Sequence, residues 1–245
     1  MKKPVPSHKG MSRKFIQSDR ALRHRIFGFE NRSEQSVRLR GVAPKIVTDT
    51  IQKYKEEYND SGARVSATVV GSAATGSAVK RRSGSSSSSD LDTFYFISNS
   101  RFKEPGEVHE SSVFSTLNDM HMRSSQKAGI SGHVNDVIYL DQLISELRTM
   151  KILTGWGGAK RRGLGAVLGA VTALFFPAIK GSLLPERKKL LSALKEHPHR
   201  ESLWKEIQVE WRERVMHAMR RRPEKVSEEE IKLMDFDKIC KLYGV

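Results

Sequence analysis

The sequence predicts an α/β (α+β) protein in which a small mixed sheet is followed by an α-helical C-terminal extension. Three short runs rich in β-branched and aromatic residues, at 65–70, 91–97 and 134–140, have the length and composition of buried strands. Helical periodicity separates these runs, and after Gly155 mainly helical segments follow. With 245 residues, 38% hydrophobic and 29% charged, the chain can bury one large core or two modest ones.

The N-terminal part of the chain combines a basic arm with one long helix. Residues 1–43 form the arm, with a short helix at 18–27. From Pro44 apolar residues recur at helical spacing, and Asn-Asp-Ser-Gly at 59–62 ends the helix. The apolar residues of this helix are Ile46, Val47, Ile51, Tyr54 and Tyr58.

The central module comprises residues 44–150. After the first helix we expect, in chain order, a strand at 65–70, a turn at Gly71-Ser72, a short helix at 73–79, a low-complexity loop at 80–89 (KRRSGSSSSS), a strand at 91–97, a helix at 111–122, a strand at 134–140 and a helix at 141–150.

The C-terminal region, residues 151–245, is predicted to be basic and helical. Its expected helices cover 164–176, 185–196, 201–221 and 228–242, the last with a capping box of Ser227 and Glu230. The apolar run 164–179 is 16 residues long and contains Pro177, which is shorter than the roughly 20 residues that span a bilayer. We therefore expect a buried helix there and no membrane span.

Charge is distributed unevenly along the chain, whose net charge is +15. Residues 1–45 hold 12 Lys and Arg against 3 Asp and Glu, and residues 151–222 hold 16 against 6, whereas residues 46–150 hold 11 against 13. Two basic segments that flank a near-neutral module are typical of a protein that binds RNA or another polyanion. Basic flanks that only aid solubility would have the same composition.

The compartment is predicted only broadly. A single cysteine, Cys240, excludes an internal disulfide and a cysteine-based zinc cluster, and it fits an intracellular, cytoplasmic environment. The Arg-rich, acid-poor N-terminus also weakly resembles an organelle transit peptide. A basic RNA-binding arm explains that composition equally well.

Two aspartates open the second predicted strand and indicate a metal site. Asp90 and Asp92 are two residues apart, so in a strand their side chains share one face, where a divalent cation offsets their repulsion. In the third predicted strand, Asp136 shares a face with apolar residues and is the candidate third ligand. Asp141 is the alternative third acid, although it is also the expected cap of the next helix.

The turn that precedes these aspartates is suited to phosphate. Gly71 lets the backbone approach a phosphate closely, and Ser72 supplies a hydroxyl. The cluster Lys80, Arg81 and Arg82 either contacts phosphates or is a solvated charge cluster.

The order of these features resembles the signature of the DNA polymerase β-type nucleotidyltransferase superfamily. That signature is a strand followed by Gly-Ser, a spacer, an Asp-x-Asp pair that opens an apolar strand (here Ser89-Asp90-Leu91-Asp92), and a later strand with a third acid. The resemblance covers about residues 44–150. It implies that an NTP such as ATP is held at Gly71, Ser72, Gly76, Ser77, Lys80 and Arg81. It also implies that Asp90, Asp92 and Asp136 are catalytic and bind Mg²⁺ (or Mn²⁺).

The spacer departs from the family pattern, because 17 residues separate Ser72 from Asp90 and the family usually carries fewer. Counting from Gly76-Ser77 leaves 12 residues, but no strand precedes that Gly-Ser directly.

Together, the aspartates, the Gly-Ser turn and the resemblance predict an enzyme that transfers a nucleoside monophosphate to a hydroxyl, with RNA as the favoured acceptor. The alternatives are a catalytically degenerate fold that binds RNA or assists ribonucleoprotein assembly, and an unrelated α/β domain.

Overall fold

The computed structural model describes residues 33–76, 78, 89–100, 112–148, 178–180, 184–219 and 235–245. The helices expected at 18–27 and 164–176 and the capping box of Ser227 and Glu230 lie outside these residues. None of the described helices has the length and apolar character needed to cross a membrane.

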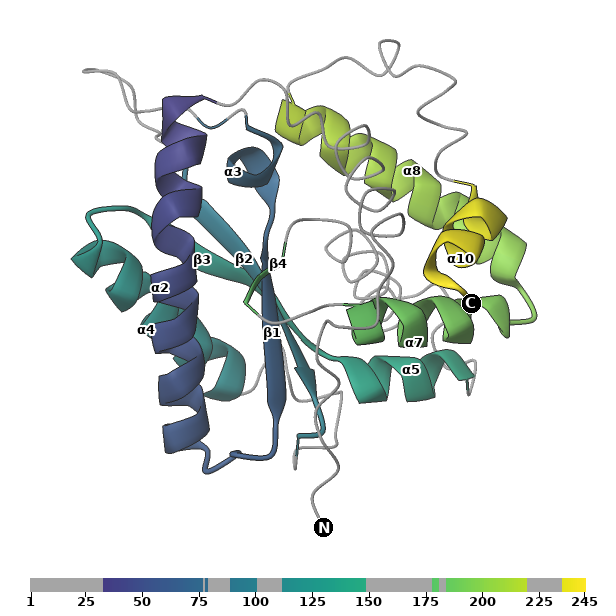
Figure 1. Cartoon of the computed structure of the whole chain (residues 1–245), viewed down its shortest axis with the longest axis horizontal. Helices are drawn as coiled ribbons and strands as arrows, with labels where there is room; N and C mark the ends of the chain where they lie inside the picture. Colours follow the sequence, from purple (N-terminus) through teal and green to yellow (C-terminus); the bar gives the residue numbers. More distant parts are fainter. Residues whose placement is uncertain are drawn as a thin grey trace.

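A four-stranded mixed sheet in the order β3-β2-β1-β4 forms the centre of the fold (Figure 1). Its strands are β1 (Arg64–Val69), β2 (Leu91–Ser98), β3 (Gly132–Tyr139) and β4 (Ala178–Lys180). β1 runs antiparallel to both β2 and β4, whereas β2 and β3 are parallel. The predicted mixed sheet is confirmed. β4 was not predicted, because three residues are too few to show a strand period.

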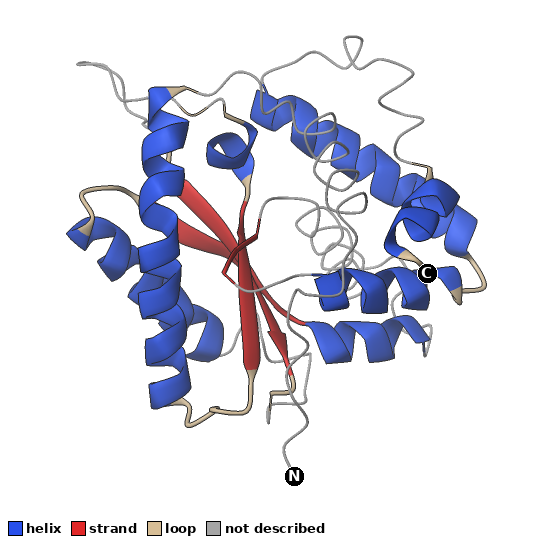
Figure 2. Cartoon of the chain, viewed as in Figure 1, coloured by secondary structure: helices blue, strands red, loops and turns tan. Residues whose placement is uncertain are grey.

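One side of the sheet is covered by α2 (Glu34–Glu57) and α4 (Ser112–Lys127) (Figure 2). Parallel strands need a crossover connection, and α4 lies in the connection between β2 and β3. Val47 and Leu117 belong, with Tyr95 and Ile97 of β2, to the core cluster on this side. The burial of these side chains holds α2 and α4 against the sheet.

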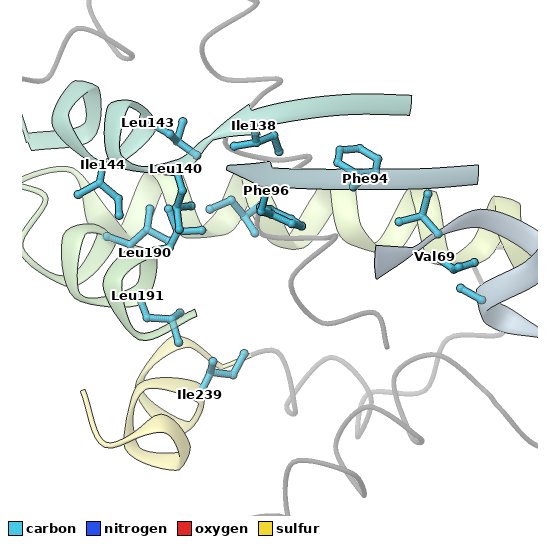
Figure 3. Packing of buried hydrophobic residues seen from close by; sticks show 14 of the residues in the cluster. Val69, Phe94, Phe96, Ile138, Leu140, Leu143, Ile144, Leu190, Leu191 and Ile239 are labelled. Carbon is cyan, nitrogen blue, oxygen red and sulfur yellow. The ribbon is translucent and has the colours of Figure 1, made fainter. Parts of the chain in front are cut away.

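The other side of the sheet carries α5 (Leu140–Arg148) and the described helices of the C-terminal region. The latter are α7 (Leu184–Lys195), α8 (Arg200–Met219) and α10 (Phe236–Tyr243), while α3 (Gly71–Thr75) follows β1 directly (Figure 1). Phe94, Phe96 and Ile138 share a core cluster with Leu190 and Leu191 of α7 (Figure 3). The helices after residue 150 therefore belong to the same core as the sheet.

The first helix is longer than the sequence predicts. α2 begins at Glu34 behind Ser33, whose Oγ accepts a hydrogen bond of 3.1 Å from the Ser36 N–H. The predicted start at Pro44 is wrong, because this proline lies inside the helix. A proline there costs about 3 kcal/mol, which the burial of Leu39 and Ala43, five and one residues earlier, helps to offset.

The last helix is shorter than the sequence predicts. α10 begins at Phe236, where Asp235 Oδ1 accepts a hydrogen bond of 3.0 Å from the Lys238 N–H. The single predicted helix over 228–242 is therefore interrupted at Asp235, while its expected start near Glu228 lies outside the described residues. The remaining predicted helices and strands that the structure describes occur in the predicted order, with shifted ends.

We predict that Asp60→Ala destabilises the fold by about 1–3 kcal/mol, because it leaves buried donors without an acceptor. Asp60 is buried, and its Oδ2 accepts hydrogen bonds from Tyr54 Oη at 2.9 Å and Ser100 Oγ at 2.7 Å. Urea unfolding at constant pH measures the loss. Asp49→Ala, an exposed carboxylate of α2, is the control and should change stability by less than about 0.5 kcal/mol. Equal effects of the two variants would contradict the prediction.

A second prediction concerns His121 of α4, which is fully buried with Nδ1 3.0 Å from Tyr95 Oη. Burial lowers the pKa of His121 to about 4, so the folded state keeps the imidazole neutral. Below about pH 6.5 the imidazole of His121 is protonated in the unfolded state but stays neutral in the folded state. The free energy of unfolding therefore falls by roughly 3 kcal/mol between pH 6.5 and 4. Above pH 6.5 this contribution is fully present.

The measurement is the free energy of unfolding against pH for the wild type and for His121→Gln. The wild type should lose more stability than the variant as the pH falls from 6.5 to 4. Parallel curves over that window would show that His121 is not the group responsible.

Candidate functional site

The turn after β1 brings the predicted phosphate-holding residues next to β2. The antiparallel pairing of β1 and β2 reaches Val69 and Thr93, and the Val70 N–H then donates to the Asp92 carbonyl at 2.9 Å. Gly71 follows at once with φ +63°, a left-handed conformation that glycine adopts without strain. Asp92 and the turn are therefore adjacent although 20 residues separate Gly71 from Asp92 in the sequence.

Gly71 makes room for the Asp92 carboxylate. A Cβ placed on Gly71 would lie 2.5 Å from Asp92 Oδ2, which is shorter than any allowed contact. Glycine is therefore required here both by its backbone angle and by the approach of a carboxylate. Ser72, the second residue of α3, is half-buried beside it.

Gly76 has a structural role in the described fold. It ends α3 with φ +83°, and its N–H donates to the Ser72 carbonyl. Its own carbonyl accepts a hydrogen bond of 2.9 Å from the Ser33 N–H, which links α3 to the start of α2. The other expected nucleotide-binding residues, Ser77, Lys80 and Arg81, lie outside the described residues.

Asp90 immediately precedes β2 and Asp92 is its second residue, and both are half-buried. Burial raises the pKa of Asp92 to about 6; the neighbouring His133 opposes that rise, and the charge of Asp90 adds to it. The two carboxylates are thus close enough to repel each other, as the strand spacing predicts. A cation placed beside them would relieve that repulsion and stabilise the ionised form of Asp92.

Asp136 lies on β3 at the register position of Phe94, two register pairs further along the strands than Asp92. Its Oδ1 accepts a hydrogen bond of 2.8 Å from the Val137 N–H. Strand geometry places the Cα atoms of Asp92 and Asp136 about 8 Å apart. Within the described ranges, no three His, Cys, Asp or Glu side chains are grouped so that they could hold a metal ion.

The alternative third acid, Asp141, lies in the first turn of α5 and is engaged elsewhere. Its Oδ2 accepts a hydrogen bond of 2.7 Å from the Asn99 N–H, and its Oδ1 lies 3.2 Å from Lys189 Nζ. Asp141 thus joins the end of β2 to α7. The strand direction places it at the opposite end of β2 from Asp92.

His133 is a site residue that sequence reasoning missed. It is the register partner of Asp92 on β3, and its Nε2 lies 3.0 Å from Asp92 Oδ1. No local motif marks it, because its partner is 41 positions earlier in the chain. The only available signal is its place near the start of a strand that also carries Asp136.

The residues present fit a divalent cation at Asp90 and Asp92. Carboxylate oxygens are the ligands that Mg²⁺ and Mn²⁺ prefer, and Mg²⁺ is usually held by one or two carboxylates together with substrate phosphates and water. Because Gly71 has no side chain, Asp92 Oδ2 lies directly against the backbone of the turn. Comparison with protein-family models, with curated proteins and with solved structures finds no match.

We predict that Gly71→Ala destabilises the fold more than Gly129→Ala. Both glycines have a left-handed φ, +63° and +67°, so alanine costs about 1–2 kcal/mol at either site. Only Gly71→Ala also forces a Cβ against a carboxylate, which adds about 1–3 kcal/mol, whereas Cβ of Gly129→Ala would meet only the end of Arg38 at 3.7 Å. Urea unfolding of both variants measures the difference, and equal losses would contradict the described approach of Asp92.

Proposed function

We propose that this chain is a Mg²⁺-dependent nucleotidyltransferase that moves a nucleoside monophosphate from an NTP to a hydroxyl, most favourably of RNA. The observation that carries the proposal is the contact between the turn at Gly71 and the Asp92 carboxylate, with Asp90 beside it. A phosphate-compatible turn and two acidic side chains meet at one end of the sheet. Their order along the chain also agrees with the family pattern that the sequence resembles.

In the proposed reaction the oxygen of the acceptor hydroxyl attacks the α-phosphorus and its proton passes to solvent. The bond between the α-phosphorus and the oxygen that bridges to the β-phosphorus breaks, and pyrophosphate leaves. Asp90 and Asp92 would hold the cation, and Asp136, the third acid that the resemblance implies, lies on the same face of the sheet. When bound, such a cation neutralises charge on the phosphate oxygens and orients them. The backbone at Gly71 and the Ser72 hydroxyl would bind and orient the triphosphate.

An RNA acceptor is supported by charge on the C-terminal helices. Lys188 and Lys195 of α7 and Arg200 and Lys205 of α8 are all exposed. They belong to the segment 151–222, whose excess of Lys and Arg is the larger of the two basic flanks. Phosphate contacts by such residues release counterions, so RNA affinity should fall steeply as salt is raised.

The second candidate function is a catalytically degenerate RNA-binding or ribonucleoprotein assembly factor. One observation favours it, namely the separation of Asp136 from Asp90 and Asp92 along the sheet, with no group of three metal-binding side chains among the described residues. A protein of this kind would keep the basic flanks and bind RNA without forming a new phosphodiester.

The test incubates the purified full-length chain with Mg²⁺ or Mn²⁺, each labelled NTP in turn and a pool of RNAs. We expect labelled RNA, and a loss of more than about 100-fold in the Asp90→Ala/Asp92→Ala variant, because ligand removal should exceed the effect of losing a supporting contact. Asp49→Ala/Asp119→Ala removes two exposed carboxylates from α2 and α4 and should leave the product unchanged.

The same experiment separates the two candidates. Wild-type protein that makes no labelled product with any NTP, yet binds RNA with a steep salt dependence, would favour the assembly factor over the transferase. Product formation that persists in Asp90→Ala/Asp92→Ala would contradict the proposed roles of these residues.

A further inference from the structure

Resting on the proposed function, we propose that His133 is a positioning residue that orients the Asp92 carboxylate for the cation. The two oxygens of this carboxylate have different neighbours. Oδ1 lies 3.0 Å from His133 Nε2, and Oδ2 is the oxygen that a Cβ on Gly71 would meet. The contact with His133 engages Oδ1, so Oδ2 is the oxygen that faces the turn where the triphosphate and its cation would sit.

An irregularity in β3 places His133 in this role. In parallel strands register partners point to the same face of the sheet, so His133 shares a face with Asp92, and Asp136 shares a face with Phe94. Asp92 and Phe94 are two residues apart on β2 and point to one face, so His133 and Asp136 do so as well. Residues three apart in a regular strand point to opposite faces. The register shift between Thr93 and Phe94 adds the residue that brings both His133 and Asp136 to one face.

The pair of His133 and Asp92 is poorly suited to a purely stabilising role. The His133 side chain is 47% exposed, and half-exposed ion pairs contribute at most about 1 kcal/mol to stability. Asp92 is more deeply placed, with 21% of its side chain exposed. Removing the imidazole should therefore change the carboxylate's orientation much more than the stability of the fold.

The physical basis is the hydrogen-bonded support that metal-binding carboxylates generally require. A carboxylate that is held by one oxygen presents the other in a defined direction, and removal of such a support typically weakens metal binding about 10- to 100-fold. The hydrogen bond requires a proton on Nε2 of His133. Gln offers an N–H at the end of a side chain of similar reach, whereas Leu fills similar space with no donor.

The test measures Mn²⁺ binding directly, by the electron paramagnetic resonance signal of free Mn²⁺, with the full-length chain. We expect His133→Leu to weaken Mn²⁺ binding about 10- to 100-fold and His133→Gln to restore most of the affinity. His199→Leu, the same change at an exposed histidine after α7, is the control and should bind as the wild type does. Urea unfolding of each variant confirms that the fold is intact.

The outcomes are distinct. If His133→Leu binds Mn²⁺ as tightly as the wild type, the positioning role is overturned while the proposed function stands. If His133→Gln is as weak as His133→Leu with both folded, the hydrogen bond is not the cause and the inference is again overturned. A wild-type chain that binds no Mn²⁺ overturns the proposed function and this inference with it.

Discussion

The antiparallel pairing of β1 with β2 is the constraint on which the candidate site depends. Its register ends with Val69 opposite Thr93, and the hydrogen bond from Val70 to the Asp92 carbonyl extends it by one step. A slip of one residue would turn every side chain of β2 to the other face and would move the aspartates away from the turn at Gly71. The site is therefore a consequence of strand register more than of any local motif.

The two core clusters maintain that register. Phe94 and Phe96 point into the cluster shared with α7, whereas Tyr95 and Ile97 point into the cluster under α2 and α4. Because both faces of β2 are buried, a register shift would exchange large side chains between two filled cores. Asp90 and Asp92 lie before this buried stretch, at the end of the strand where side chains still reach solvent.

Much of the framework follows from local sequence rules. Runs of β-branched and aromatic residues predicted three of the strands. The two-residue spacing of Asp90 and Asp92 predicted that their carboxylates lie close together. The start of α2 was mispredicted because the helical spacing of apolar residues was recognised only from Pro44, whereas the helix begins at Glu34 and also buries Leu39 and Ala43. Tertiary packing overrides the local preference there.

The rest of the site depends on contacts between distant parts of the chain. The approach of Asp92 to Gly71 and the pairing of Asp92 with His133 both follow from strand pairing, which one-dimensional spacing does not encode. The irregularity that brings His133 and Asp136 to one face is equally non-local. Sequence reasoning could therefore identify the type of chemistry at this end of the sheet but not its complete set of residues.

The most direct test of the central claim is a crystal structure of the full-length chain with Mn²⁺ and a non-hydrolysable NTP analogue. We predict an anomalous Mn²⁺ peak bound by the carboxylates of Asp90 and Asp92 and by the triphosphate, with the phosphates against the backbone of Gly71 and Ser72. A triphosphate bound elsewhere, or a Mn²⁺ peak that contacts neither aspartate, would contradict the claim.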